Sequence, residues 1–137
     1  DSLRSSRTAA GAMPLAEESF GRSIKSDGPF TIRLENDRGE QLRFGLNDIN
    51  EFFIDRSESG DCHFSDWYDR PEYQVVRQER IMGGQVKMQA FFDVSMLELF
   101  ADEGLFACNS VVYPTSPYSR MTVSGPVNVD YQVRTGR

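Results

Sequence analysis

Residues 88–104 read MQAFFDVSMLELFADEG and predict two β-strands joined by a short turn. Glu98 stands between two leucines, so an alternating strand directs the leucines into a core and the carboxylate away from it. Phe91 and Phe92 are adjacent and must point to opposite sides, which places one ring outside the main core or under a loop.

The same kind of pattern recurs from Glu17 onward. Runs of β-branched and aromatic residues alternate with turn residues, and sustained apolar spacing at three and four residues is hard to find. Alternation predicts that Ile32, Leu34, Leu42 and Phe44 face a core. The predicted strands are Ser19–Lys25, Pro29–Leu34, Gln41–Leu46, Glu51–Asp55, Tyr73–Arg80, Val86–Asp93, Met96–Ala101, Leu105–Tyr113, Arg120–Ser124 and Val127–Arg134. These strands predict an all-β fold, a two-sheet antiparallel β-sandwich.

The length of 137 residues fits one domain. Residues 1–16 are rich in small, polar and basic side chains, which predicts a linker or an N-terminal arm, and residues 17–137 form the predicted sandwich. Order in the arm is expected to come from a partner. The segment lacks the apolar core of a signal peptide and an initiating Met, so we expect a piece excised from a longer protein.

The net charge of -6 repels phosphate backbones and anionic lipid, so the sequence predicts no nucleic-acid partner and no membrane partner. It contains no apolar run near the roughly 20 residues of a membrane helix. Cys62, Cys108 and His63 are too few to form an ordinary zinc site, so no metal and no cofactor is predicted. The cysteines form either a disulfide or, more in keeping with how free Cys packs, two separate thiols.

The segment from Cys62 to Glu72 is a long loop that carries Trp67 and Tyr68 among carboxylates. Aromatic rings can stack on sugars while carboxylates accept hydroxyl hydrogen bonds, so the loop is a candidate ligand-binding element. The alternative is a loop held on the sandwich, or against another domain, by its own aromatic side chains.

Two pairs of charged residues are further candidates for ligand binding. Asp55 with Arg56 lies near the end of one strand, and Asp93 with Glu98 flanks a turn. These side chains could converge on the hydroxyl groups of a terminal sugar. In the alternative interpretation, the two aspartates cap turns and Arg56 pairs with a neighbouring carboxylate.

Residues 88–104 resemble the hairpin "hydrophobic, Asp, x-Ser, hydrophobic-Glu-hydrophobic-Phe, x-Asp/Asn-x-Gly" of the C-terminal β-sandwich in glycoside hydrolase family 32, which contains invertases, levanases and inulinases. Residues 52–60, FFIDRSESG, resemble the "Ile-Asp-Arg-Ser-x-Ser-Gly" strand end of the same domain. With the start at Phe30, the matches cover about residues 29–134. The resemblance implies a sandwich of two antiparallel sheets beside a five-bladed propeller that carries the chemistry.

The catalytic motifs of that family do not occur in this sequence. There is no Trp-Met-Asn-Asp-Pro-Asn-Gly-like motif, Arg70-Pro71 lacks the Asp of Arg-Asp-Pro, and neither cysteine follows a Glu. No catalytic residue is therefore assigned. The resemblance implies a non-catalytic C-terminal domain of a fructan- or sucrose-cleaving β-fructosidase, which supports the propeller and its oligomer.

Two other functions stay open. Similar sandwiches are levan-binding modules that hold a terminal fructose, for which the candidate residues above would form the site. The chain could also be a complete small enzyme or an unrelated protein-interaction sandwich. Enzymes of the family are secreted or cytosolic, and the resemblance favours a secreted or extracytoplasmic location.

Overall fold

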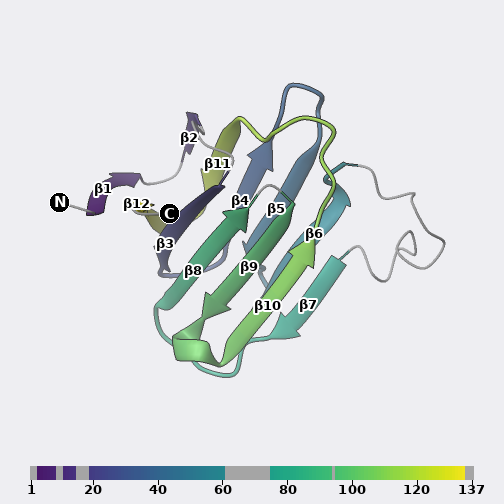
Figure 1. The fold of residues 1–137 in the computed structure, drawn as a ribbon. Coiled ribbons are helices and arrows are strands. Elements are labelled where there is room, and N and C mark those ends of the chain that lie inside the picture. The colour runs from purple at the N-terminus through teal and green to yellow at the C-terminus, as the bar shows by residue number, and fades with distance from the viewer. Residues whose placement is uncertain (1–2, 9–10, 15–18, 61–74, 94, 135–137) are drawn as a thin grey trace.

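The computed structural model describes residues 3–8, 11–14, 19–60, 75–93 and 95–134 of the chain. Within these ranges, twelve strands form two six-stranded antiparallel sheets, which face each other as a sandwich (Figure 1). Sheet A has the strand order β1-β12-β3-β8-β9-β10, and sheet B has the order β2-β11-β4-β5-β6-β7. The strands are β1 (Leu3–Thr8), β2 (Gly11–Pro14), β3 (Ser19–Ser26), β4 (Phe30–Glu35), β5 (Gln41–Leu46), β6 (Glu51–Glu58), β7 (Val75–Glu79), β8 (Val86–Asp93), β9 (Met96–Ala101), β10 (Phe106–Val111), β11 (Arg120–Ser124) and β12 (Val127–Arg134). The predicted fold class is confirmed.

The core lies between the two sheets and is built by alternation along each strand. In β4 and β5 the predicted core residues Ile32, Leu34, Leu42 and Phe44 are all buried, and their neighbours in sequence turn outward. Aromatic side chains also pack between the two sheets. Phe52 of β6 stacks on Phe106 of β10 with 4.5 Å between ring centroids, and both rings belong to one continuous core.

Two buried contacts of Tyr118 hold the segment between β10 and β11 against the sandwich. The Tyr118 hydroxyl, on the segment between β10 and β11, donates a 2.5 Å hydrogen bond to the carbonyl of Ser59, which follows β6. The Tyr118 ring packs against Phe92 of β8, with centroids 5.6 Å apart. Adjacent Phe91 points to the outer side of sheet A, so the prediction that these two rings point to opposite sides is confirmed.

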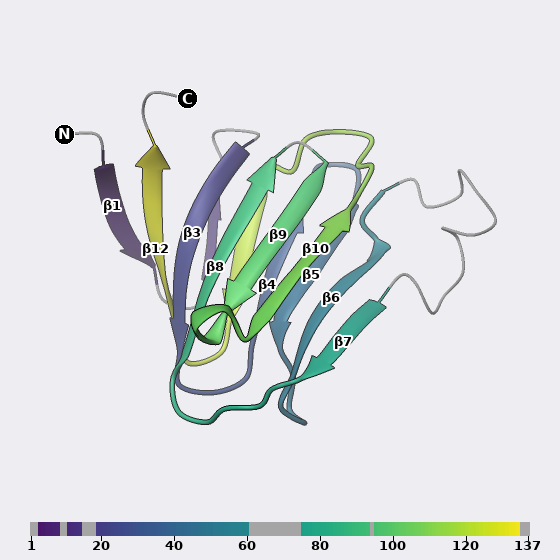
Figure 2. The ribbon, with the colours of Figure 1, turned by 60° about the horizontal axis from the view of Figure 1, so that its bottom comes forward.

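A buried ion pair ties the ends of the two sheets together. Arg80 follows β7 of sheet B, and Asp102 begins the short 3-10 turn Asp102–Gly104 after β9 of sheet A. The guanidinium donates from Nε to Oδ2 at 2.8 Å and from Nη2 to Oδ1 at 3.0 Å, and both side chains are buried. Arg80 also donates to the carbonyls of Gly84 and Gln85, so one side chain organises the β7–β8 connection along the lower end of Figure 2.

The strand boundaries agree in part with the sequence prediction. The bounds of β5, β8, β9, β11 and β12 are those predicted. β6 was predicted to end at Asp55 but runs to Glu58, because a register shift between Gln41 and Arg43 lets the strand continue to pair with β5. β10 is shorter than predicted, since Leu105 belongs to the preceding turn, where its N–H bonds the Asp102 carbonyl.

The predicted linker or arm contributes two further strands, which the sequence prediction missed. β1 pairs with β12 and β2 pairs with β11, so each is the outermost strand of its sheet. Both partners belong to this chain. The division of the chain at residue 16 remains a prediction. The described residues include no helix long and apolar enough to cross a membrane.

Candidate functional site

Asp55 lies on β6 with its side chain on the outer face of sheet B. Its Oδ2 accepts a 2.8 Å hydrogen bond from Nη2 of Arg43 on the neighbouring strand. Its Oδ1 accepts bonds from the N–H and the hydroxyl of Ser57, at 3.0 and 2.6 Å. Both carboxylate oxygens therefore make bonds within the domain, as the turn-capping interpretation predicts.

Arg56 follows Asp55 and points the other way, into the sandwich, where it is only 5% exposed. Its carbonyl accepts bonds from the N–H and the hydroxyl of Ser59, at 3.0 and 2.6 Å. Adjacent residues on one strand thus lie on opposite sides of sheet B. The pair Asp55 and Arg56 does not form one surface site.

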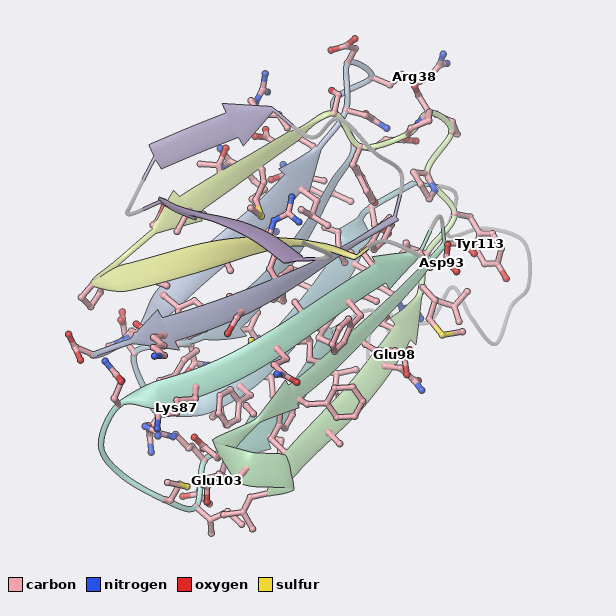
Figure 3. The ribbon with its side chains drawn as sticks, turned by 60° about the vertical axis from the view of Figure 1, so that its left-hand side comes forward. Arg38, Lys87, Asp93, Glu98, Glu103 and Tyr113 are labelled. Carbon is pink, nitrogen blue, oxygen red and sulfur yellow. The ribbon has the colours of Figure 1, made fainter. Side chains whose placement is uncertain are left out.

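Asp93 and Glu98 lie on the outer face of sheet A. Asp93 ends β8, and Figure 3 places it near Tyr113 at one end of the sandwich, whereas Glu98 lies farther along the face. Glu98 is exposed, which confirms the prediction that it points away from the core. Its cross-strand neighbours are Phe91 on β8 and Asn109 on β10.

The outward-facing members of the two predicted pairs therefore lie on opposite sides of the molecule. Asp55 faces outward from sheet B, and Asp93 and Glu98 face outward from sheet A, with the whole core between them. Trp67 and Tyr68 lie outside the described residues. A ligand-binding role for any of the six remains a prediction, but the structure does not gather Asp55, Asp93 and Glu98 into one site.

The outer face of sheet A has a feature that the sequence analysis missed. Strand register aligns nine outward positions on β8, β9 and β10 in three rows, which we call the sheet A face. The rows are Asp93, Met96 and Val111; Phe91, Glu98 and Asn109; and Gln89, Phe100 and Ala107. Five of the nine are apolar, two are amides and two are carboxylates, and the exposed Lys87 is the next outward position of β8 beyond these rows.

The large apolar side chains of the sheet A face are partly open to solvent. Met96 is 40% exposed and Phe100 is 39% exposed. Phe91 meets Phe100 edge to face with ring centroids 6.1 Å apart, and it covers Gly21 on β3 so closely that a Cβ there would lie 3.2 Å from the ring. The signal in the sequence was the apolar residues at the outward positions of these strands, which a solvated face would fill with polar side chains.

The outer face of sheet B has the opposite chemistry. Arg33 and Arg120 both approach Glu35, at 3.3 and 3.4 Å, and Arg43 lies between Asp55 and Glu58 at 2.8 and 3.5 Å. Burial raises the pKa of Glu35, but hydrogen bonds from Arg120 and Thr122 and the nearby arginine charges outweigh it and hold this pKa below its usual value. This face is a solvated network of ion pairs.

The remaining titratable groups form no additional centre in the described residues. Cys108 is a free thiol packed against the core, and burial raises its pKa, which disfavours the reactive thiolate. Cys62 lies outside the described residues. No group of three or more His, Cys, Asp or Glu side chains in the part described is placed to hold a metal ion.

Known proteins resemble this chain in sequence and in fold. A levanase of Bacillus sp. (strain L7) is 29% identical over 92 residues, which span 66% of this chain and 10% of the levanase. Exo-inulinase of Aspergillus awamori superimposes with a TM-score of 0.76 at 20% identity, over 97% of this chain and 29% of that one. Sucrose-6-phosphate hydrolase of Lactobacillus gasseri gives 0.77 at 14% identity, over 98% and 28%.

The chain thus spans a tenth of the levanase and less than a third of these solved structures, and the structural likeness at such low identity shows the fold. The family is shown by the model described as "Glycosyl hydrolases family 32 C terminal", which matches residues 7–133 and so nearly the whole chain. With the hairpin of residues 88–104 and the two-sheet sandwich in place, this protein belongs to the C-terminal domain family of the family 32 glycosyl hydrolases.

Proposed function

We propose that this domain is the non-catalytic C-terminal part of a fructan- or sucrose-cleaving hydrolase, and that it packs against and stabilises the catalytic propeller of that enzyme. The observation that carries the proposal is the sheet A face, on which five of the nine aligned outward side chains are apolar and Met96 and Phe100 are 40% and 39% exposed. Contiguous exposed apolar patches on a soluble domain mark contact surfaces.

The composition of the sheet A face supports a protein partner. Phe91, Phe100 and Met96 provide apolar contact area, and aromatic and Met side chains are enriched at protein interfaces. Glu98 lies among them, and no ion pair within the described residues involves it. The matching surface is therefore apolar with at least one basic group, which would meet Glu98 when the two parts associate.

The likeness to larger proteins also supports this proposal. The relatives that this chain resembles are named as a levanase, an exo-inulinase and a sucrose-6-phosphate hydrolase, and each is several times longer than this chain. The catalytic motifs of the family are absent from this sequence. A supporting role beside a separate catalytic part accounts for both observations.

The proposal is tested by producing this chain and the catalytic propeller of its parent enzyme as two polypeptides and measuring their association by calorimetry. Phe100→Ser on the sheet A face is expected to weaken binding about 30-fold or more, because exposed aromatic anchors at interface centres are worth about 2 kcal/mol or more. The matched control is Phe53→Ser, which removes a half-buried ring from the outer face of sheet B.

Three results would contradict the proposal. The unmodified chain fails to bind the propeller; the Phe53 variant loses affinity while the Phe100 variant keeps it; or both variants bind as the unmodified chain does. Glu98→Lys is a second test of the same face, because it replaces the carboxylate expected to meet a basic group. The affinity of this variant for the propeller is expected to fall more at low salt than at high salt.

A further inference from the structure

Three short connections at the lower end of the sandwich carry large apolar side chains that the fold leaves exposed. They join β5 to β6, β7 to β8 and β9 to β10, and they lie together in Figure 2. The side chains, which we call the end patch, are between 37% and 75% exposed and belong to Ile49, Ile81, Met82 and Leu105. They are half of the large hydrophobic side chains that are exposed in the described part of the chain, so this end of the molecule is unusually apolar.

Hydrogen bonds through Arg80 tie the three connections to one another. The backbone N–H of Arg80 donates to the carbonyl of Asn50 at 2.9 Å, which joins the β5–β6 turn to the β7–β8 connection. Its guanidinium binds the buried carboxylate of Asp102, and the Asp102 carbonyl in turn accepts a 3.2 Å bond from the N–H of Leu105. The end patch is therefore held in one arrangement before any partner binds, which lowers the entropic cost of binding.

The fold gives these apolar side chains little packing to do. In the β5–β6 turn the Asn47 side chain accepts bonds from the N–H groups of Ile49 and Glu51, at 3.1 and 2.9 Å, so the turn is held without the Ile49 side chain. Ile49 and Ile81 leave more than two thirds of their surface to water. Polar side chains are usual in solvated turns, so a group of apolar ones indicates a contact surface.

The charges on the three connections favour a partner with basic groups. Arg80 is the only cation in their sequences, residues 47–50, 80–85 and 102–105, and Asp102 pairs with it. No ion pair within the described residues involves Asp48 or Glu103. A second copy of this chain would present the same two carboxylates, so a surface that carries Lys or Arg among apolar groups is the better match.

The end patch adjoins the sheet A face at the 3-10 turn. Phe100 lies in the row of that face nearest the turn, and Leu105 directly follows the turn. Figure 3 shows Glu98 on the face and Glu103 at the adjoining end of the sandwich. Both surfaces combine exposed apolar side chains with carboxylates that form no ion pair within the described residues, so one apolar and basic partner surface matches both.

We propose that the contact with the catalytic propeller continues from the sheet A face around the 3-10 turn and covers the end patch. This inference rests on the proposed function, because it takes the same propeller as the partner. In the complex the end patch packs on apolar side chains of the propeller, and basic groups there meet Asp48 and Glu103. A contact on two adjoining sides of the sandwich prevents the two parts from sliding or turning, so it fixes their orientation as well as their association.

Methionine oxidation by dilute hydrogen peroxide tests this inference in the intact parent enzyme. Met82 lies in the end patch and Met96 on the sheet A face, and both are partly exposed in this chain, whereas Met88 and Met121 are buried in the core. Oxidation requires access to the thioether sulfur. We expect Met82 and Met96 to oxidise about tenfold more slowly in the parent enzyme than in this chain alone, and the two core methionines to oxidise slowly in both. Mass spectrometry of the peptides measures each site.

The two exposed methionines separate this inference from the proposed function. Protection of Met96 without Met82 would leave the propeller contact in place and overturn its extension over the end patch. Protection of neither would overturn both, and protection of Met82 alone would contradict a contact that continues from the sheet A face. Protection of Met82 that grows with the concentration of this chain alone would assign the end patch to a second copy and would also overturn the inference.

Substitution measures how much the end patch contributes to binding of the propeller in calorimetry. Ile81→Ser is expected to weaken binding about tenfold or more, because an apolar side chain is then missing from the contact. Ile81 is mostly exposed, so the variant is expected to fold. The matched control is Val76→Ser, which changes an exposed aliphatic side chain near the other end of β7 and is expected to leave the affinity unchanged.

The charge of the end patch is tested separately. Asp48→Lys reverses a carboxylate expected to meet a basic group, so the loss of affinity is expected to be larger at low salt than at high salt. An Ile81→Ser variant that binds like the unmodified chain, while Phe100→Ser binds weakly, would overturn the inference and leave the proposed function standing. Equal losses in Ile81→Ser and Val76→Ser would overturn it as well.

Discussion

The outer faces of the two sheets are built on the same alternating backbone but carry different chemistry. On sheet B the outward positions hold arginines and carboxylates joined in ion pairs, with Arg43 and Glu35 each contacting two partners. On sheet A the outward positions hold Phe91, Met96 and Phe100, with Glu98 among them. A sandwich that stands alone in water needs both faces solvated, so the difference supports the proposal that the sheet A face contacts a partner.

The largest expected effect comes from loosening the ion pair that holds the two sheets in place. Asp102→Ala leaves the Arg80 guanidinium buried without its carboxylate, and we expect a loss of about 3–5 kcal/mol in the free energy of unfolding. Urea unfolding followed by circular dichroism measures this loss. The control is Glu103→Ala at the exposed neighbouring position, expected to change stability by less than about 0.5 kcal/mol. Equal effects at 102 and 103 would contradict a role for the pair.

The second-largest expected effect shows whether Phe100 on the sheet A face serves contact with a partner or the stability of the isolated domain. Phe100→Ser removes one ring of the edge-to-face pair with Phe91, so we expect the isolated chain to lose about 1 kcal/mol of stability. Binding of a hydrophobic dye to the folded chain is expected to fall at the same time, because the apolar patch is smaller. A stability loss as large as that of Asp102→Ala would show that Phe100 belongs to the core and would remove the contrast between the two faces.

A smaller effect is expected from pH on the sheet B face. The pKa of Glu35 lies below its usual value of 4.5, so the folded state favours the charged carboxylate. The resulting stability is present above pH 4.5 and is lost as the pH falls through the lowered value. Because the group lies near the surface, we expect less than about 1 kcal/mol. Glu35→Gln should flatten the stability curve in this acidic range, and an unchanged curve would contradict the assignment.

The smallest expected effect concerns sugar binding. Calorimetric titration of this chain with levan, with inulin, sucrose and cellulose as comparisons, is expected to give no saturable heat, because Asp55 lies on the opposite face from Asp93 and Glu98. Saturable binding to levan would instead favour the levan-binding alternative. Alanine variants at Asp55, Trp67 and Glu98 would then show which part of the chain holds the sugar.

Much of the fold was predictable because local pattern and tertiary packing agree. The alternation in β4 and β5 fixed which residues face the core, and turns with Gly or Pro marked strand ends such as that of β11. The strands β1 and β2 were missed because their small and polar residues carry no alternation. Their partners, β12 and β11, lie more than a hundred residues away in the sequence, so pairing comes from tertiary structure alone.

The candidate site was predicted less well for a related reason. Alternation placed Glu98 outward and shows that adjacent Asp55 and Arg56 face opposite ways, but it does not tell which sheet a strand joins. That Asp55 belongs to sheet B and Glu98 to sheet A follows from strand order, which no local pattern encodes. The register that aligns Phe91, Glu98 and Asn109 in one row is likewise a property of three strands together.

The pairing of β1 with β12, from Leu3 opposite Arg134 to Thr8 opposite Val129, also has a kinetic consequence. Bringing these strands together closes nearly the longest loop that the chain can form, whereas the β8–β9 hairpin closes one of the shortest. The hairpin is therefore expected to be among the first parts to fold, and β1 among the last. In the native state, amide hydrogens of β1 should exchange with solvent long before those of β8, through openings that leave the rest of the sandwich folded.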